Sequence, residues 1–159
     1  MKTKVLGKKL KKLDISGKDL LDSIPRNSKK IKHGIDIWNV YDFMFKDKKE
    51  VPHLKVLEII IPSNSKFIVE SKSMKLYLNS FYDVAFNNQA EILKKIKHDL
   101  KTLIKDDVKL RFLEKFSVEP KNISLNKSNR KIIQCKKIIK FNGFRSICPV
   151  TSQPDFANI

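Results

Sequence analysis

Two stretches of the 159-residue chain have the spacing of an amphipathic helix. In residues 70–81, ESKSMKLYLNSF, apolar side chains recur at i, i+3, i+4 and i+7, and these are Met74, Tyr77, Leu78 and Phe81. From residue 92 a second run forms one stripe, made of Ile92, Leu93, Ile96, Leu100, Leu103 and Ile104. Asn88, followed three residues later by Glu91, is typical of the start of that helix. The pattern therefore predicts two helices that each bury one face.

Shorter stretches alternate between apolar and polar residues, as β-strands do. Residues 36–46 and 53–62 predict two strands joined by a polar turn, and residues 66–69 and 108–116 predict two more. Apart from the short 66–69 stretch, the order is strand, strand, helix, helix, strand. This order is typical of an α+β fold in which an antiparallel sheet carries both helices on one face.

The first of these strands is apolar on both faces. The stretch alternates well enough to place one set of side chains together, namely Ile35, Ile37, Asn39, Tyr41 and Phe43. The other face receives Trp38, Val40 and Phe45, which predicts a sheet that is covered on both sides. A lone tryptophan in a strand can stack on a base, but it is more often part of a core or an interface.

The charge balance is strongly basic, with 34 lysine and arginine residues against 17 acidic ones and a formal net charge of +17. Such a charge suggests a polyanionic partner. Only four basic residues are arginines, the side chain on which sequence-specific readers and phosphate clamps rely. A chain rich in lysine, isoleucine and asparagine is also what an A+T-rich genome would encode. We therefore expect nucleic-acid binding to be no more than non-specific.

The composition bounds the class of protein further. Apolar residues make up 41% of the chain, enough for a packed core, and no run approaches 18 consecutive apolar residues. The N-terminus has lysines but no apolar signal segment, so we expect a cytoplasmic protein without a membrane helix. Two cysteines, Cys135 and Cys148, and three scattered histidines fit no zinc spacing. We expect neither a bound metal nor a disulfide.

The start of the first predicted helix offers one candidate for chemistry. Unpaired amide groups and the helix dipole make a helix start favourable for anions, and Lys72 and Lys75 would add positive charge there. The alternative is an ordinary surface helix in which Ser71 or Ser73 is the N-cap. From the pattern alone the ordinary helix is the better interpretation.

A second candidate lies near the C-terminus, where Cys148 precedes Asp155 by seven residues. A thiolate is a soft nucleophile suited to a nitrile carbon, and a carboxylic acid can supply the proton that the nitrile nitrogen then needs. Pro154 stiffens the approach to Asp155. From spacing alone, the favoured interpretation is structural: Cys148 is a buried small residue and Asp155 is a turn residue.

Four segments nevertheless occur in the order and form of one enzyme family. The 70–81 stretch resembles the E-S-K-S-x-K-L-Y motif of NADPH-dependent 7-cyano-7-deazaguanine reductases, the nitrile reductases of queuosine biosynthesis (the QueF family). Residues 24–26, IPR, and 33–38, HGIDIW, resemble the family's VPR and HGTDIW segments. Residues 148–155, CPVTSQPD, are similar to its C-x-x-T-x-Q-P-D signature. The resemblance runs from about Ile24 to the last residue.

This resemblance implies a reaction and its residues. Cys148 would attack the nitrile of 7-cyano-7-deazaguanine to form a covalent thioimide, and Asp155 would donate the proton. Two NADPH molecules would deliver two hydrides in turn, giving the 7-aminomethyl product. By the same carry-over the substrate pocket would be lined by Val69, Glu70 and Ser71, while Ser71 and Lys72 would contact NADPH. The chain has no G-x-G-x-x-G, so a Rossmann site is not expected.

The resemblance also implies the tunnelling fold (T-fold), in which antiparallel sheets with paired helices join edge to edge into barrels, and a homodimer. We expect a basic, flexible N-terminus over residues 1–23, a first T-fold unit over 24–116, a linker over 117–131 and the start of a second unit over 132–159. The family would continue beyond Ile159 with the rest of the second sheet and further ligand-binding residues. We therefore expect either a fragment of such an enzyme or an inactive remnant.

Two other functions stay open. One is a non-catalytic, lysine-rich protein that binds RNA on half a T-fold, which explains the charge but none of the four motifs. The other is a different T-fold activity on a purine or a pterin, such as that of a cyclohydrolase-like enzyme. That activity would need Cys and His metal ligands that the sequence does not group, and it leaves CPVTSQPD unexplained.

Overall fold

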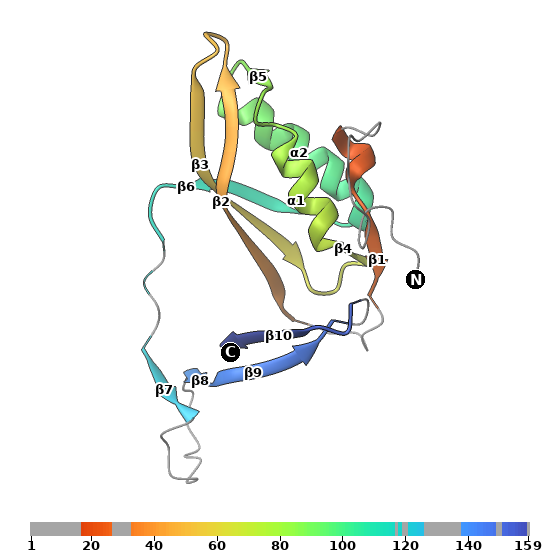
Figure 1. Ribbon diagram of the computed structural model, residues 1–159, viewed down its shortest axis with the longest axis vertical. Helices are drawn as coiled ribbons and strands as arrows, with labels where there is room; N and C mark the ends of the chain where they lie inside the picture. Colours follow the sequence, from red (N-terminus) through yellow and green to blue (C-terminus); the bar gives the residue numbers. More distant parts are fainter. Residues whose placement is uncertain are drawn as a thin grey trace. The chain divides into compact units, whose positions relative to one another are not determined.

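The computed structural model describes residues 17–26, 33–116, 118, 121–125, 138–148 and 151–158 (Figure 1). The described residues up to Lys115 form one compact unit, and those from Phe116 onward form another. Both contain strands and the first also contains the two long helices, so the chain is α+β, as its sequence pattern predicts.

The first unit is built on a four-stranded sheet with the order β5-β2-β3-β6. β2 and β3 form a long antiparallel hairpin, β6 pairs antiparallel with β3, and the two residues of β5 pair parallel with the end of β2. The strands predicted at 36–46, 53–62 and 108–116 are confirmed, the last of them in shortened form. Their bounds are β2 (Ile35–Asp47), β3 (Pro52–Pro62), β5 (Ala85–Phe86) and β6 (Lys109–Leu113).

A β-bulge in β2 overturns the predicted distribution of its side chains. Val40 pairs with Leu57 but Phe43 pairs with Lys55, so β2 carries one extra residue between these pairs. An extra residue exchanges the two faces of the strand beyond it. Phe43 therefore leaves the face of Ile35 and Ile37 and lies in the core, where it is 1% exposed. Strict alternation could not predict this exchange.

Both predicted helices are present, and their apolar stripes pack on the same face of the sheet as Phe43. They are α1 (Ser71–Asn79) and α2 (Gln89–Ile104). Asn88 is the N-cap of α2, and its side chain accepts a hydrogen bond from the amide of Glu91, as predicted. The central side chains of one core are fully buried, and they include Leu57, Ile59, Met74, Tyr77, Ile92, Ile96, Leu100 and Ile104.

A short N-terminal segment crosses the start of α1. It consists of the 3-10 helix η1 (Gly17–Leu20) and β1 (Ser23–Pro25), and β1 pairs antiparallel with β4 (Phe67–Val69). Leu20 and Leu21 are 4% and 2% exposed and belong to the core. Part of the stretch that we assigned to a basic N-terminus, residues 1–23, therefore packs inside the first unit.

The opposite face of the sheet is apolar and exposed within the chain. Ile35, Ile37, Tyr41 and Leu54 are each more than half exposed. The prediction of a sheet covered on both sides therefore does not hold for this unit by itself. Among the described residues, no helix is long and apolar enough to cross a membrane.

The second unit contains two separate strand pairs. β7 (Asn122–Ser124) pairs parallel with β8 (Ile138–Lys140), and β9 (Asn142–Ile147) pairs antiparallel with β10 (Pro154–Asn158). β7 lies in the range that we assigned to a linker. The β9–β10 hairpin carries the predicted nucleophile segment.

Candidate functional site

The start of α1 is organised by the carboxylate of Glu70. Its backbone is extended, and it is the N-cap of the helix. One carboxylate oxygen accepts the amide of Lys72 at 2.9 Å and the other accepts the amide of Ser73 at 2.8 Å. The residue is only 2% exposed. Neither Ser71 nor Ser73 is the N-cap, because a glutamate at this position spans both amides of the first turn.

Ser73 ties the same turn to the N-terminal segment. Its hydroxyl donates to the backbone carbonyl of Glu70 at 2.8 Å and accepts the amide of Asp22 at 3.0 Å. The amide of Glu70 in turn donates to the carbonyl of Asp22 at 2.9 Å. Ser73 is completely buried. Residue 22 and the first turn of α1 are therefore held together by both backbone and side-chain bonds.

The other residues of this motif that we predicted for the site differ in their exposure to solvent. Val69 packs in the core, whereas Ser71 is exposed and Lys72 is half-buried. Ser71 lines a pocket of about 210 Å³ between β2 and α1, together with Trp38, Asp42 and Lys75. The structure thus brings the exposed side of the 70–81 motif together with the tryptophan of the 33–38 segment. Sequence reasoning singled out Trp38 but did not connect it to this helix.

Two other motif segments meet through an ion pair. The guanidinium of Arg26 contacts the carboxylate of Asp36 at 2.5 Å and lies 3.4 Å from the hydroxyl of Ser65. The amide of Arg26 donates to the carbonyl of Lys66. Arg26 belongs to the IPR segment and Asp36 to HGIDIW. The ion pair gives both motifs a structural role, which their spacing alone did not reveal.

The predicted catalytic pair lies on the β9–β10 hairpin. The register pairs Asp155 with Ser146, and the amide of Cys148 donates to the carbonyl of Gln153 at 2.9 Å. Ser146 therefore shares a face of the hairpin with Asp155, and Cys148 directly follows the last residue of β9, Ile147. Cys148 is half-buried and Asp155 is exposed. The fold of the hairpin therefore brings the backbones of the two residues to the same end of the strand pair.

The turn between the strands is closed by local hydrogen bonds. The amide of Ser152 donates to the carbonyl of Cys148 at 2.9 Å, and Ser152 adopts a left-handed backbone with φ of +57°. The amide of Gln153 lies 3.4 Å from the hydroxyl of Thr151. These contacts fix the backbone at Cys148, directly after the end of β9.

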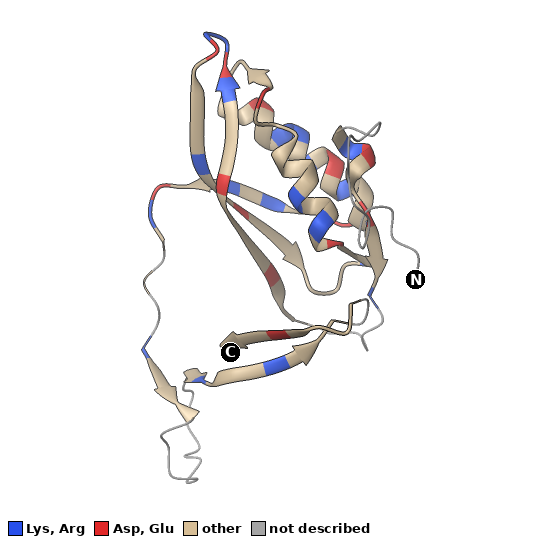
Figure 2. Cartoon of the chain, viewed as in Figure 1, with Lys and Arg blue, Asp and Glu red and all other residues tan. Residues whose placement is uncertain are grey.

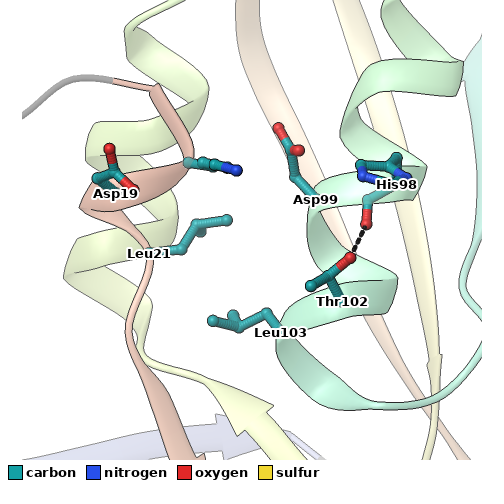
Figure 3. A pocket seen from close by; sticks show the side chains of 7 residues that line it. Asp19, Leu21, His98, Asp99, Thr102 and Leu103 are labelled. Atoms are coloured by element: carbon teal, nitrogen blue, oxygen red, sulfur yellow. Dashed lines mark hydrogen bonds between the residues drawn. The ribbon is translucent and has the colours of Figure 1, made fainter.

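A larger cavity, of about 360 Å³, lies elsewhere, between η1 and α2 (Figure 3). Its one deeply buried acid is Asp99. The Asp99 carboxylate accepts a hydrogen bond from the hydroxyl of Tyr77 at 2.8 Å and forms an ion pair with Lys95 at 3.4 Å. Burial, reinforced by Asp99, raises the pKa of Tyr77, so this hydroxyl stays a donor. Asp99 thus joins the two helices, and the cavity adds nothing to the candidate site.

Three of the four lysines of α2 form ion pairs within the unit, and acidic positions lie among the basic ones (Figure 2). Lys95 pairs with Asp99, while Lys97 and Lys101 both pair with Asp107. The hydrogen bond from Lys97 lowers the pKa of Asp107, which keeps that carboxylate charged. This pairing weakens the argument for a lysine surface that binds RNA.

Within the described part of the chain, no three histidine, cysteine or acidic side chains are placed to hold a metal ion.

Comparison with known proteins relates these segments to one family. A sequence model of the family described as "Nitrile reductase, 7-cyano-7-deazaguanine-reductase N-term" matches residues 13–112. A protein of Rickettsia bellii named NADPH-dependent 7-cyano-7-deazaguanine reductase is 32% identical over 185 aligned positions, which include 97% of this chain and 67% of that protein. The Buchnera aphidicola protein of the same name is 31% identical over 151 positions, which include 79% of this chain and 56% of that protein.

The α+β unit, the 70–81 motif and these matches place the chain among the nitrile reductases. More narrowly, it belongs to the family of 7-cyano-7-deazaguanine reductases, as the four motifs indicated. A relative from Coxiella burnetii with the same name is 28% identical, and the chain spans only 52% of its length. The matched relatives are therefore considerably longer than this chain.

The nucleophile segment lies beyond the family match, which ends at residue 112. The Rickettsia alignment extends further, since its 97% of 159 residues leaves about five residues outside and Cys148 is followed by eleven. That alignment therefore includes Cys148. It is also longer than the chain itself, so the relative carries residues in the aligned region that this chain lacks.

The Glu70 cap leads to a test of stability. We expect Glu70→Ala to lower the free energy of unfolding by about 1–3 kcal/mol, because two first-turn amides lose their partner in a buried site. Glu70→Gln, which keeps one acceptor oxygen, should cost less. Urea unfolding measures both.

Glu114→Ala is the matched control, because it removes an exposed carboxylate after β6 and should leave stability almost unchanged. A Glu70→Ala protein as stable as Glu114→Ala would show that the cap is not what holds this helix start.

Proposed function

We propose that this chain acts in the NADPH-dependent reduction of the nitrile of 7-cyano-7-deazaguanine to the 7-aminomethyl compound, a step that serves tRNA modification with queuosine. The observation that carries the proposal is the register of the β9–β10 hairpin, which brings Cys148 and Asp155 to the same end of the strand pair. Membership of the reductase family supplies the substrate and the cofactor. A free thiol nucleophile needs a reducing compartment, so we place the activity in the cytoplasm.

The covalent step balances with these two side chains. The Asp155 carboxylate accepts the proton of the Cys148 thiol, and the thiolate attacks the nitrile carbon to form the C–S bond. One π bond of the nitrile breaks, and its electron pair moves to the nitrogen. Asp155 then donates the proton to that nitrogen and returns to its carboxylate form. The product is a thioimide, and no redox change has yet occurred.

NADPH supplies hydride to the former nitrile carbon, and two equivalents are needed to reach the amine. We assign Ser71 and Lys72 to the cofactor. Because Glu70 occupies the amides of Lys72 and Ser73, recognition of the cofactor phosphates falls to the hydroxyl of Ser71 and the ammonium of Lys72. The unpaired helix start that the sequence suggested is therefore only partly available.

We assign Val69, Glu70 and Ser71 to the substrate side. Each oxygen of the Glu70 carboxylate accepts one amide in capping α1, and the oxygen bonded to Lys72 also accepts the Ser71 hydroxyl at 3.5 Å. The oxygen bonded to Ser73 can accept a further donor. The cap would thus hold the carboxylate at a fixed position for a second donor. Val69 packs in the core, so its contribution is to support Glu70 from the end of β4.

We further propose that the first unit is a T-fold and that the protein is a homodimer. The support is the exposed apolar face of the β2–β3 hairpin, with Ile37 52% and Leu54 61% exposed. Exposed apolar side chains gathered on one sheet face often mark an interface. The sheet also ends in short or partly paired edge strands that can receive another sheet.

The covalent step can be tested by intact mass after incubation with 7-cyano-7-deazaguanine without NADPH. We expect the unsubstituted chain to gain the mass of one ligand and Cys148→Ala to gain none, because the thiolate forms the bond. Cys135→Ala removes the other thiol and should keep the adduct. An adduct that persists in Cys148→Ala would remove this residue from the mechanism.

The cofactor assignment predicts a selective loss of affinity. Lys72→Ala should weaken NADPH binding about tenfold or more, the size of one hydrogen bond to a charged group, and leave binding of 7-cyano-7-deazaguanine within about twofold. Titration calorimetry with each ligand measures both affinities. Lys94→Ala, which removes an exposed lysine of α2, is the control. Equal losses for both ligands, or none, would place the cofactor elsewhere.

The dimer can be tested at the exposed sheet face. We expect sedimentation velocity to show a dimer that Ile37→Lys converts to a monomer, because a charge on a covered apolar face is costly. Val84→Lys, which alters another exposed apolar residue outside the strands, should remain dimeric. A monomeric unsubstituted chain, or a dimeric Ile37→Lys, would contradict the proposal.

A further inference from the structure

The pocket of about 210 Å³ between β2 and α1 extends well beyond Ser71. Ser71, Lys75 and Asn79 line it at intervals of four residues, which places them on one side of the helix. At a rise of 1.5 Å per residue they extend over about 12 Å of α1. The pocket therefore begins at a residue that we assign to NADPH and continues away from the helix start, as an elongated cofactor requires.

The wall that β2 contributes to this pocket contains the only tryptophan of the chain. Trp38 is half-buried, packs against the core and pairs with the buried Ile59. Its ring is therefore held in place while part of it stays open to the pocket. The buried Met74 and Leu78 line the same space from the helix. A flat aromatic ring beside apolar side chains is suited to stack on a heterocyclic base.

The same wall carries a carboxylate. Asp42 lies in the β-bulge of β2, between the paired residues Val40 and Phe43, and lines the pocket. Its side chain is exposed and has no hydrogen bond or ion pair with any residue that the structure describes. An ionised carboxylate only accepts hydrogen bonds, so it favours a base that presents a donor. Adenine presents its exocyclic amine, whereas hypoxanthine has a carbonyl at that position.

We propose that this pocket binds the adenine ring of NADPH, which stacks on Trp38 and donates its exocyclic amine to the Asp42 carboxylate. The inference rests on the proposed function. Hydride transfer requires the nicotinamide ring at the carbon bonded to Cys148, whereas every described residue that lines this pocket belongs to the first unit. The pocket therefore suits the end of the cofactor that does not react.

The first measurement uses the emission of Trp38, the sole source of tryptophan fluorescence in the chain. We titrate the full chain with adenosine 2′,5′-bisphosphate, which is the adenosine part of NADPH without its nicotinamide. We expect saturable quenching, because the base stacks on the indole ring. Inorganic pyrophosphate, which has phosphates but no base, should leave the emission unchanged. Absence of quenching by the bisphosphate, or equal quenching by pyrophosphate, overturns the inference.

The second measurement tests the carboxylate through base selectivity. Titration calorimetry compares NADPH with its hypoxanthine analogue, and the unsubstituted chain should bind NADPH about tenfold more tightly, because only adenine offers Asp42 a donor. Asp42→Ala should bind the two within about twofold of each other. Glu114→Ala removes an exposed carboxylate outside the pocket and should keep the preference. A full preference in Asp42→Ala contradicts the contact.

The third measurement tests the stacked ring by the affinity for adenosine 2′,5′-bisphosphate. Trp38→Leu should weaken binding about tenfold or more, and Trp38→Phe, which keeps a ring, should stay within about threefold. Tyr82→Leu removes an exposed aromatic ring outside the pocket and should not change the affinity. An unchanged affinity in Trp38→Leu rules out the stack. If Trp38→Leu does not fold, the selectivity of Asp42→Ala decides the question.

These measurements separate failure of the inference from failure of the proposed function. If the unsubstituted chain binds NADPH but the bisphosphate does not quench Trp38 and Asp42→Ala keeps its selectivity, the adenine lies elsewhere and the proposed function stands. If calorimetry shows no NADPH binding to the unsubstituted chain, the proposed function is overturned and the inference falls with it.

Discussion

The arrangement of the first unit depends on the buried carboxylate of Glu70. A buried charge is costly unless it is hydrogen-bonded, and here the amides of the α1 first turn provide the bonds. The same residue joins the backbone of Asp22 through its amide, and Ser73 closes the contact from the helix side. Glu70 and Ser73 together therefore fix where β4 ends, where α1 begins and where the N-terminal segment crosses them.

This constraint also explains how a structural and a ligand-binding role can share one motif. The groups of a site are positioned most precisely when helices and strands hold them. The 70–81 motif places the exposed Ser71 directly beside Glu70, which is fixed by its hydrogen bonds to the first turn of α1. The apolar stripe of the helix holds it against the sheet from the other side. Successive residues of a single turn thus cap the helix, pack in the core or stay exposed to solvent.

The sequence was sufficient for features that repeat or act locally. Both helices, the Asn88 cap and the β2–β3 hairpin follow from periodicity and from contacts a few residues apart. It was not sufficient for contacts between distant segments: Ser73 bonds residue 22, and Arg26 is paired with Asp36 by the fold. The approach of Cys148 and Asp155 at one end of the hairpin required the register and the turn, which their seven-residue spacing does not specify.

The β2 bulge limits the length of that strand more strictly than its composition. The inserted residue exchanges the two faces of the strand. The core therefore receives the even-numbered side chains up to Val40 and the odd-numbered side chains from Phe43 onward. Removing a single residue between them would return every later side chain of the strand to the wrong surface, whereas most substitutions there alter one contact. An insertion or deletion at this point therefore disturbs the fold far more than a change of residue type does.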